Sequence, residues 1–223
     1  KRGIRMENGK QVDYGENNEY YNIFIRDGLD LFAIWIRYFR EIGVRPWLSF
    51  RMNDCHDSAS ETSFMQSNFF YDHPEYRRVR HHIADGYFAR CFDYSIQAVR
   101  DDMLAYINES LERYDVDGIE LDFMREMFCF APGQEYAGIE IMNEYMRTIR
   151  NAVAHWEQVR GHKIFVGVKL FAIPHQVYYS GFDVFTWAKE HLIDVLVVGP
   201  RWETVDNDLP VEVWKKMMEP YGV

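Results

Sequence analysis

The stretch Val116-Asp117-Gly118-Ile119-Glu120-Leu121-Asp122-Phe123-Met124-Arg125 contains the pattern that decides the fold. Apolar residues at 119, 121 and 123 alternate with Glu120 and Asp122, and a period of two residues is typical of a β-strand. Carboxylates on one face and large apolar side chains on the other favour a strand that packs on helices and points its acidic face into a barrel. Asp122 falls near the C-terminal end of this strand, where catalytic side chains lie in a (β/α)8 barrel.

The composition indicates one globular domain over residues 1–223, because 48% of the residues are hydrophobic and 17% are aromatic. The net charge of -10, without a basic run, argues against a nucleic-acid or anionic-membrane partner. No apolar run approaches the roughly 18–20 residues of a membrane span. The chain opens without an initiator methionine or a signal-like segment, so we expect it to begin inside a longer gene product. Cytoplasmic, periplasmic and secreted locations, and the oligomeric state, therefore stay open.

The cysteines Cys55, Cys91 and Cys129 are far apart in the sequence and form no CxxC pair. A single disulfide stays open, but the spacing indicates neither a disulfide scaffold nor a structural zinc site. We predict no metal and no cofactor.

Helical and strand periodicities alternate along the chain. We predict helices over residues 28–43, 96–114, 136–160, 184–191 and 210–218, with Ser95 as an N-cap and Gly43 and Gly161 as stops. We predict strands over residues 45–53, 91–94, 116–125, 163–171 and 194–199, the last buried on both faces. Residues 1–27 are predicted to form a long N-terminal loop, and 55–90 an ordered, aromatic-rich connection.

Strict alternation of strands and helices predicts a parallel sheet with crossover helices. A doubly wound sheet is the competing fold, but the chain has no glycine-rich phosphate loop, and polar residues recur on the inner face of several strands. These observations favour an α/β fold of the (β/α)8 TIM-barrel class. Five strands are recognisable, so about three of the eight would lie outside this chain. A missing part or a partner would then cover the open edges.

Charged residues cluster at the predicted carboxyl ends of the strands. Cleavage of a glycosidic bond needs one ionised and one protonated carboxyl group. Asp122 is the candidate for the ionised group, because Lys169 on the next strand would stabilise its charge. Glu203 is the first candidate for the acid and Glu126 the second. The candidate substrate-binding residues are Trp47, Arg51, Asn53, Asp54, His56, Arg125, Lys169, Arg201 and Trp202.

Each candidate also has a purely structural interpretation. Asp122 with Lys169 or Arg51 would form an ion pair inside the barrel, and Glu120 would be a buried hydrogen-bonding group. Glu203 lies in a polar loop, and exposure to solvent alone would explain a carboxylate at this position. His56, between acidic residues, suggests a metal ligand, yet substrate contact or loop capping explains it equally. Trp47 and Trp202 would stack on sugar rings or belong to the core.

Several of these segments resemble glycoside-hydrolase-like TIM-barrel proteins, including bacterial members whose activity is only inferred. Residues 117–125, with the helix end at 112–116, resemble the fourth-strand motif of that family, and 49–57 its second-strand end. Residues 181–187 and 194–198 resemble its fifth helix and sixth strand, so the resemblance spans 29–218. In related retaining α-glycosidases the nucleophile ends strand four and the acid/base ends strand six. The resemblance thus implies Asp122 and Glu203, while the first strand and the last two are not recognisable.

The leading hypothesis is a glycoside hydrolase acting on an oligo- or polysaccharide, and the arginine-rich rim hints at an acidic sugar. Two alternatives remain. One is a glycan-binding barrel without turnover. The other is a metal-dependent hydrolase that uses Asp54, His56 and Asp122.

Overall fold

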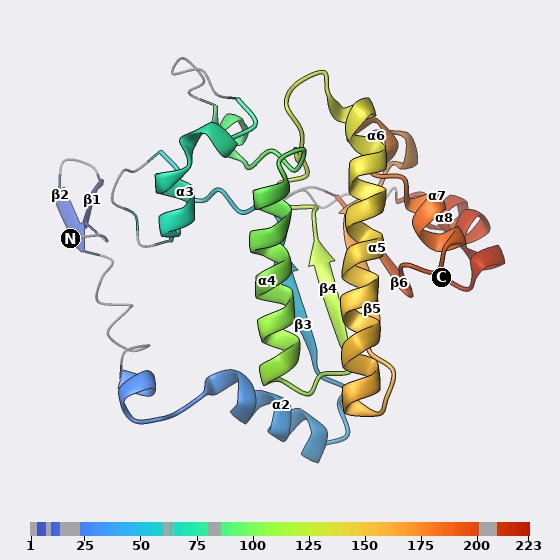
Figure 1. The fold of residues 1–223 in the computed structure, drawn as a ribbon, viewed down its shortest axis with the longest axis horizontal. Coiled ribbons are helices and arrows are strands. Elements are labelled where there is room, and N and C mark those ends of the chain that lie inside the picture. The colour runs from blue at the N-terminus through green and yellow to red at the C-terminus, as the bar shows by residue number, and fades with distance from the viewer. Residues whose placement is uncertain are drawn as a thin grey trace.

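The centre of the molecule is a four-stranded parallel sheet (Figure 1). The computed structural model describes residues 4–7, 10–13, 23–59, 63, 65–79, 86–200 and 209–223. The strands are β3 (Trp47–Arg51), β4 (Gly118–Asp122), β5 (Phe165–Phe171) and β6 (Val195–Gly199). Their order in the sheet is their order in the chain, β3-β4-β5-β6. Each strand therefore adds on the same side of its predecessor, as in a singly wound barrel, whereas a doubly wound sheet reverses direction.

The predicted crossover helices are confirmed within a few residues. The helices are α2 (Leu31–Glu41), α3 (Asn68–Asp72), α4 (Gln97–Arg113), α5 (Glu135–Arg160), α6 (Pro174–Tyr179), α7 (Val184–Lys189) and α8 (Val211–Met218). Helices α4 and α5 contact each other and lie in front of the sheet in Figure 1. Gly161 ends α5 with a φ of 76°, a left-handed conformation that glycine adopts without strain. The parallel α/β sheet is confirmed, and the closed eight-stranded barrel stays a prediction.

Three local predictions were wrong. Residues 4–13 contain a hairpin of β1 (Ile4–Glu7) and β2 (Lys10–Asp13), not only loop. Ser95 does not cap α4, since Ile96 holds the N-cap position and no side chain caps it. Residues 91–94 form no strand but follow a 3-10 turn, Tyr87–Arg90. The amide of Asn53 bonds both the N–H and the C=O of Phe92, and an isolated antiparallel bridge pairs Phe92 with Arg77, so that segment is held by a side chain and a short backbone bridge.

The core lies between the sheet and its helices, as the alternation of β4 predicted. Ile119 and Leu121 point away from the acidic face and are fully buried. They belong to one cluster with buried residues of α4, α5, α7 and β5, including Ile107, Leu111, Met146, Ile149, Val153, Val166, Val168 and Trp187. Burial of this apolar layer is the main favourable contribution to folding.

The opposite face of the sheet carries the polar residues of the strands in register. Ser49 donates to Glu120 at 2.8 Å, so the predicted hydrogen bonding of that carboxylate is confirmed, but its predicted burial is wrong because Glu120 is only half-buried. β6 is not buried on both faces, because Val195 and Val197 are 37% and 36% exposed. Among the described strands, β3 and β6 each pair on one side only.

The described helices include none long and apolar enough to span a membrane.

Candidate active site

The candidate site lies at the carboxyl edge of the sheet, where β3 and β4 run into their loops. Strand pairing places Arg51 opposite Asp122, and Asp122 opposite Lys169. Neighbouring parallel strands are about 4.8 Å apart, so this register forms a row of alternating charge across three strands. The structure thus brings these three predicted rim residues side by side on adjacent strands.

Asp122 points to the inner face and is held by two partners. Its Oδ2 lies 3.6 Å from Nζ of Lys169, and its Oδ1 accepts a hydrogen bond from the backbone N–H of Met124 at 3.0 Å. The residue is only 7% exposed, whereas the Lys169 side chain is 30% exposed. The predicted ion pair is therefore present, and the lysine lies on its solvent side.

The loop after β3 holds the ring of His56 in a defined orientation. His56 Nδ1 lies 2.5 Å from Asp54 Oδ1, and the backbone N–H of His56 donates to the same oxygen. A carboxylate only accepts hydrogen bonds, so Nδ1 carries the proton. Nε2 of His56 faces Nη2 of Arg125 at 3.2 Å, and because arginine only donates, Nε2 must be the acceptor. Arg51 completes the chain with a bond of 2.9 Å to Asp54.

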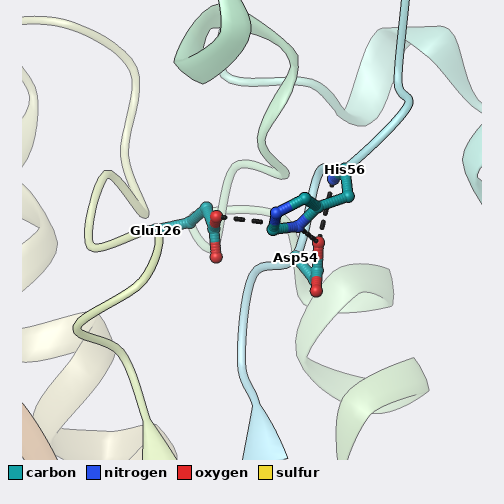
Figure 2. Close-up of side chains that lie close together, drawn as sticks. All are labelled: Asp54, His56 and Glu126. Atoms are coloured by element: carbon teal, nitrogen blue, oxygen red, sulfur yellow. Dashed lines mark hydrogen bonds and ion pairs between the residues drawn. The ribbon is translucent and has the colours of Figure 1, made fainter. Parts of the chain in front are cut away.

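Two carboxyl groups of this network differ in their environments (Figure 2). Burial raises the pKa of Glu126, and the charge of Asp54 adds to this effect, although a hydrogen bond from Tyr87 at 2.9 Å opposes it. Burial also disfavours the charge on Asp54, but hydrogen bonds from His56 and Arg51 outweigh it, and the net pKa is lowered. The imidazole of His56 lies between them, with Nδ1 4.0 Å from Glu126. Two carboxyl groups whose pKa values are shifted in opposite directions therefore lie around one histidine.

Arg51 connects the two parts of the rim. Its hydrogen bond to Asp54 raises its pKa, and so do the charges of Asp54, Glu126 and Asp122, against a smaller loss of hydration. All three carboxyl groups are thus within electrostatic reach of one guanidinium group.

Two predicted substrate-binding residues have other positions. Asn53 is 3% exposed and its amide also reaches the carbonyl of Phe128, so it ties loops together. Trp47 begins β3 and therefore lies at the amino edge of the sheet, away from the rim. There its ring stacks on Phe165 at 6.1 Å and covers Gly118, where an added Cβ would lie 2.4 Å from the indole.

Three further candidates, Arg201, Trp202 and Glu203, lie outside the described residues. Tyr87 was missed by sequence reasoning. It belongs to the long connection after β3, and only the aromatic content of that segment indicated order. No local spacing links it to Glu126, which lies 39 positions later.

The loop carrying His56 is anchored by buried thiols. Cys55 and Cys91 are free and fully buried, and their sulfur atoms lie 3.2 Å apart. Cys55 also contacts the carbonyl oxygen of Tyr87 at 3.5 Å. The two loops that bring His56 and Tyr87 to Glu126 are therefore packed directly on each other.

One ligand atom each from Asp54, His56 and Glu126 lie within 4.8 Å of one another, close enough to hold a metal ion. The metal-binding set predicted from the sequence was Asp54, His56 and Asp122. The cluster in the structure differs from it, because its third member is Glu126. Guanidinium groups contact both Asp54 and His56, and their positive charge opposes cation binding.

A cavity of about 450 Å³ opens elsewhere, between α2 and the end of α4. It is lined by apolar residues such as Phe32 and Trp35 together with Tyr114. Since Tyr114 lies at the end of α4, in the connection that leads into β4, this cavity is at the amino edge and is not part of the rim.

Comparisons with known proteins place the fold. No protein-family model matches the sequence, and no curated protein matches it. The structure is similar to catalytic domain 2 of the Group II chitinase of Ostrinia furnacalis, with a TM-score of 0.50 and 12% identity over 98% of this chain. A mutant of that domain in complex with a chitin oligosaccharide, (NAG)5, gives a TM-score of 0.48 and 13% identity over 96% of this chain.

A glycoside hydrolase family 18 N-acetylglucosaminidase from Paenibacillus barengoltzii matches 47% of this chain and 30% of its own, with a TM-score of 0.38 and 17% identity. The chain spans about half of the chitinase domain, 51% and 49% in the two structures. The likeness is one of fold. At these identities it extends to the α/β architecture with a parallel sheet and not to residues of the site.

Proposed function

We propose that this chain carries the active site of a glycoside hydrolase that cleaves an oligo- or polysaccharide. The observation that supports it most is the pair of contrasting carboxyl groups at the carboxyl edge of the sheet. Glu126 is buried with a raised pKa, whereas Asp122 faces the ammonium group of Lys169. The fold shared with a chitinase catalytic domain is consistent with this chemistry.

In this proposal Glu126 protonates the leaving oxygen and Asp122 stabilises or attacks the anomeric carbon. A glycosidase needs both functions at once, because the leaving group departs with a proton while positive charge develops on the sugar ring. Burial keeps a carboxylic acid protonated at a pH where an exposed one is ionised. Glu203 remains the other candidate for the acid.

The remaining rim residues would bind the sugar. Arg51 and Lys169 are 49% and 30% exposed at their side chains and can donate to hydroxyl groups as well as to their carboxylates. His56 is held in one tautomer by Asp54, so its ring has a defined orientation toward the rim.

The test measures hydrolysis by the variants on two sets of glycosides. One set has poor leaving groups and the other has dinitrophenol as leaving group, and the sugars tested include chitin oligosaccharides. Asp122→Asn should lose at least about 100-fold in kcat/KM on both sets. Glu126→Gln should lose about 100-fold or more on poor leaving groups only, since dinitrophenolate departs without a proton. Glu120→Gln is the matched control, because it lies on the same strand and face and its amide oxygen still accepts from Ser49.

Activity of Asp122→Asn equal to the parent would end the proposal. Loss of poor-leaving-group activity in Glu203→Gln, with Glu126→Gln unchanged, would transfer the acid role to Glu203.

A metal-dependent hydrolase is the second candidate, favoured by the grouping of Asp54, His56 and Glu126. It requires stoichiometric metal in the purified protein and loss of activity with a chelator. Full activity in metal-free protein would exclude it. A glycan-binding barrel without turnover would instead retain sugar affinity in Asp122→Asn and show no hydrolysis in the parent.

A further inference from the structure

We propose that Arg125 binds a carboxylate group of the substrate, so that the preferred glycan contains uronic acid units. This inference rests on the proposed function and names its substrate class. Arg125 lies in the loop directly after β4, beside Glu126 and three positions after Asp122.

The guanidinium group of Arg125 is held by His56 and has no carboxylate partner among the described residues. Its one hydrogen bond within the described part of the chain goes to Nε2 of His56 at 3.2 Å. Its Nε is buried and has no hydrogen-bond partner there. Arg125 as a whole is half-buried, so a ligand that accepts hydrogen bonds would reach the terminal N–H groups of its guanidinium and not the buried Nε.

Other arginines with a buried, unbonded Nε are compensated differently. Arg77 lies over the ring of Phe70 and bonds its carbonyl oxygen. Arg160 bonds two carbonyl oxygens at the end of α4 and lies over Trp156. Arg125 differs from both in contacting an imidazole at the candidate site.

The histidine contact holds Arg125 without cancelling its charge. Asp54 accepts the proton of His56 Nδ1, which leaves Nε2 as an acceptor for Arg125. Asp54 itself is matched by Arg51 at 2.9 Å. The network therefore orients the guanidinium through an imidazole and not through a carboxylate that would pair with its charge.

In the described part of the rim, Arg125 differs from the other two cationic residues in having no carboxylate partner. Within the described residues Arg51 matches Asp54, Lys169 matches Asp122, and Arg125 has no carboxylate within ion-pair distance. Arg125 therefore leaves one guanidinium charge without a carboxylate partner in the described part of the rim. A single carboxylate would balance it, and its two oxygens fit the guanidinium fork.

The experiment measures binding of uronic acid trisaccharides, of the galacturonate, glucuronate and mannuronate types, and of their methyl esters, which keep the shape and lose the charge. Titrations by NMR or calorimetry use parent, Arg125→Gln and Arg125→Lys. The parent should bind at least one acid about tenfold or more tightly than its ester, the range of a charge-assisted hydrogen bond. Arg125→Gln should bring that ratio to about 1, and Arg125→Lys should retain part of it.

Lys163→Gln is the matched control, because Lys163 precedes β5 at the amino edge and pairs with Asp194 at 3.1 Å. It should keep the parent ratio, and thermal denaturation verifies that all variants are folded. The inference is overturned if the parent binds no uronate, if it binds acids and esters equally, or if Arg125→Gln keeps the preference. Arg125-dependent binding of a sulfated trisaccharide, without binding of any uronate, would overturn the carboxylate assignment.

The outcomes also separate this inference from the proposed function. Hydrolysis of neutral glycans without an acid preference removes the inference and leaves the glycosidase. Arg125-dependent uronate binding without hydrolysis of any glycan supports the inference and removes the glycosidase.

Discussion

Replacing Lys169 by methionine tests whether the Asp122 ion pair is structural, catalytic or both. Nζ and Oδ2 are 3.6 Å apart, and the two side chains are 30% and 8% exposed. At this distance an effective dielectric constant of about 20 gives an attraction of about 4–5 kcal/mol. The exposure of the lysine and the lost hydration of both groups reduce the net coupling to about 1–2 kcal/mol.

We expect Lys169→Met to lower the free energy of unfolding by about 2–3 kcal/mol, because it leaves a nearly buried carboxylate without its partner. Asp122→Asn should cost about 1 kcal/mol, since an amide needs no counter-charge. The double variant should lose about 1–2 kcal/mol less free energy of unfolding than the two single variants lose in sum. Urea denaturation of all four proteins measures this cycle, and hydrolysis assays on the same samples measure function.

The two readouts separate the roles of the pair. Recovery of stability in the double variant without recovery of hydrolysis means that Asp122 has a chemical function beyond the ion pair. Strictly additive stability effects would refute the pairing geometry. Parental activity in the double variant would show that the pair is structural only.

Two other perturbations probe the rim and the opposite edge of the sheet. Burial raises the pKa of Glu126 and the hydroxyl of Tyr87 lowers it, so Tyr87→Phe should move the alkaline limb of the pH profile of kcat/KM to higher pH. A shift to lower pH would contradict the assigned acid. Gly118→Ala should cost about 1–3 kcal/mol, because its Cβ would lie 2.4 Å from the Trp47 ring. The cost should disappear in a Trp47→Ala background, and thermal denaturation that shows equal costs in both would disprove the steric explanation.

The sequence could predict which side chains of each strand share a face, because this alternation follows from local backbone geometry. Alternation at 119–123 correctly assigned Leu121 to the core and Asp122 to the inner face, and the same reasoning assigned Lys169 to the adjacent position on β5. Trp47 was predicted among the sugar-contacting residues, although its place at the start of β3 already implied the amino edge.

The role of the Asn53 side chain could not be predicted from the residues next to it in the sequence. Its position after β3 suggested a substrate contact, but its amide bonds Phe92 and Phe128, which come from loops 39 and 75 positions away. A polar side chain at a strand end serves the substrate or the loops according to the path of those loops, and strand periodicity contains no information about that path.

The sequence by itself determined where the strands of the parallel sheet and their crossover helices lie and which face of each strand bears charge, but not the β1–β2 hairpin or the absence of a strand at 91–94. These properties depend on periods of 2 and 3.6 residues and on chain connectivity, which are local. Only the tertiary structure decided that Tyr87 reaches Glu126, that His56 is oriented by Asp54, and that Arg125 is without a carboxylate in the described residues. Contacts between distant loops arise from packing of the whole chain, because burial and hydrogen-bond satisfaction are optimised together and not residue by residue.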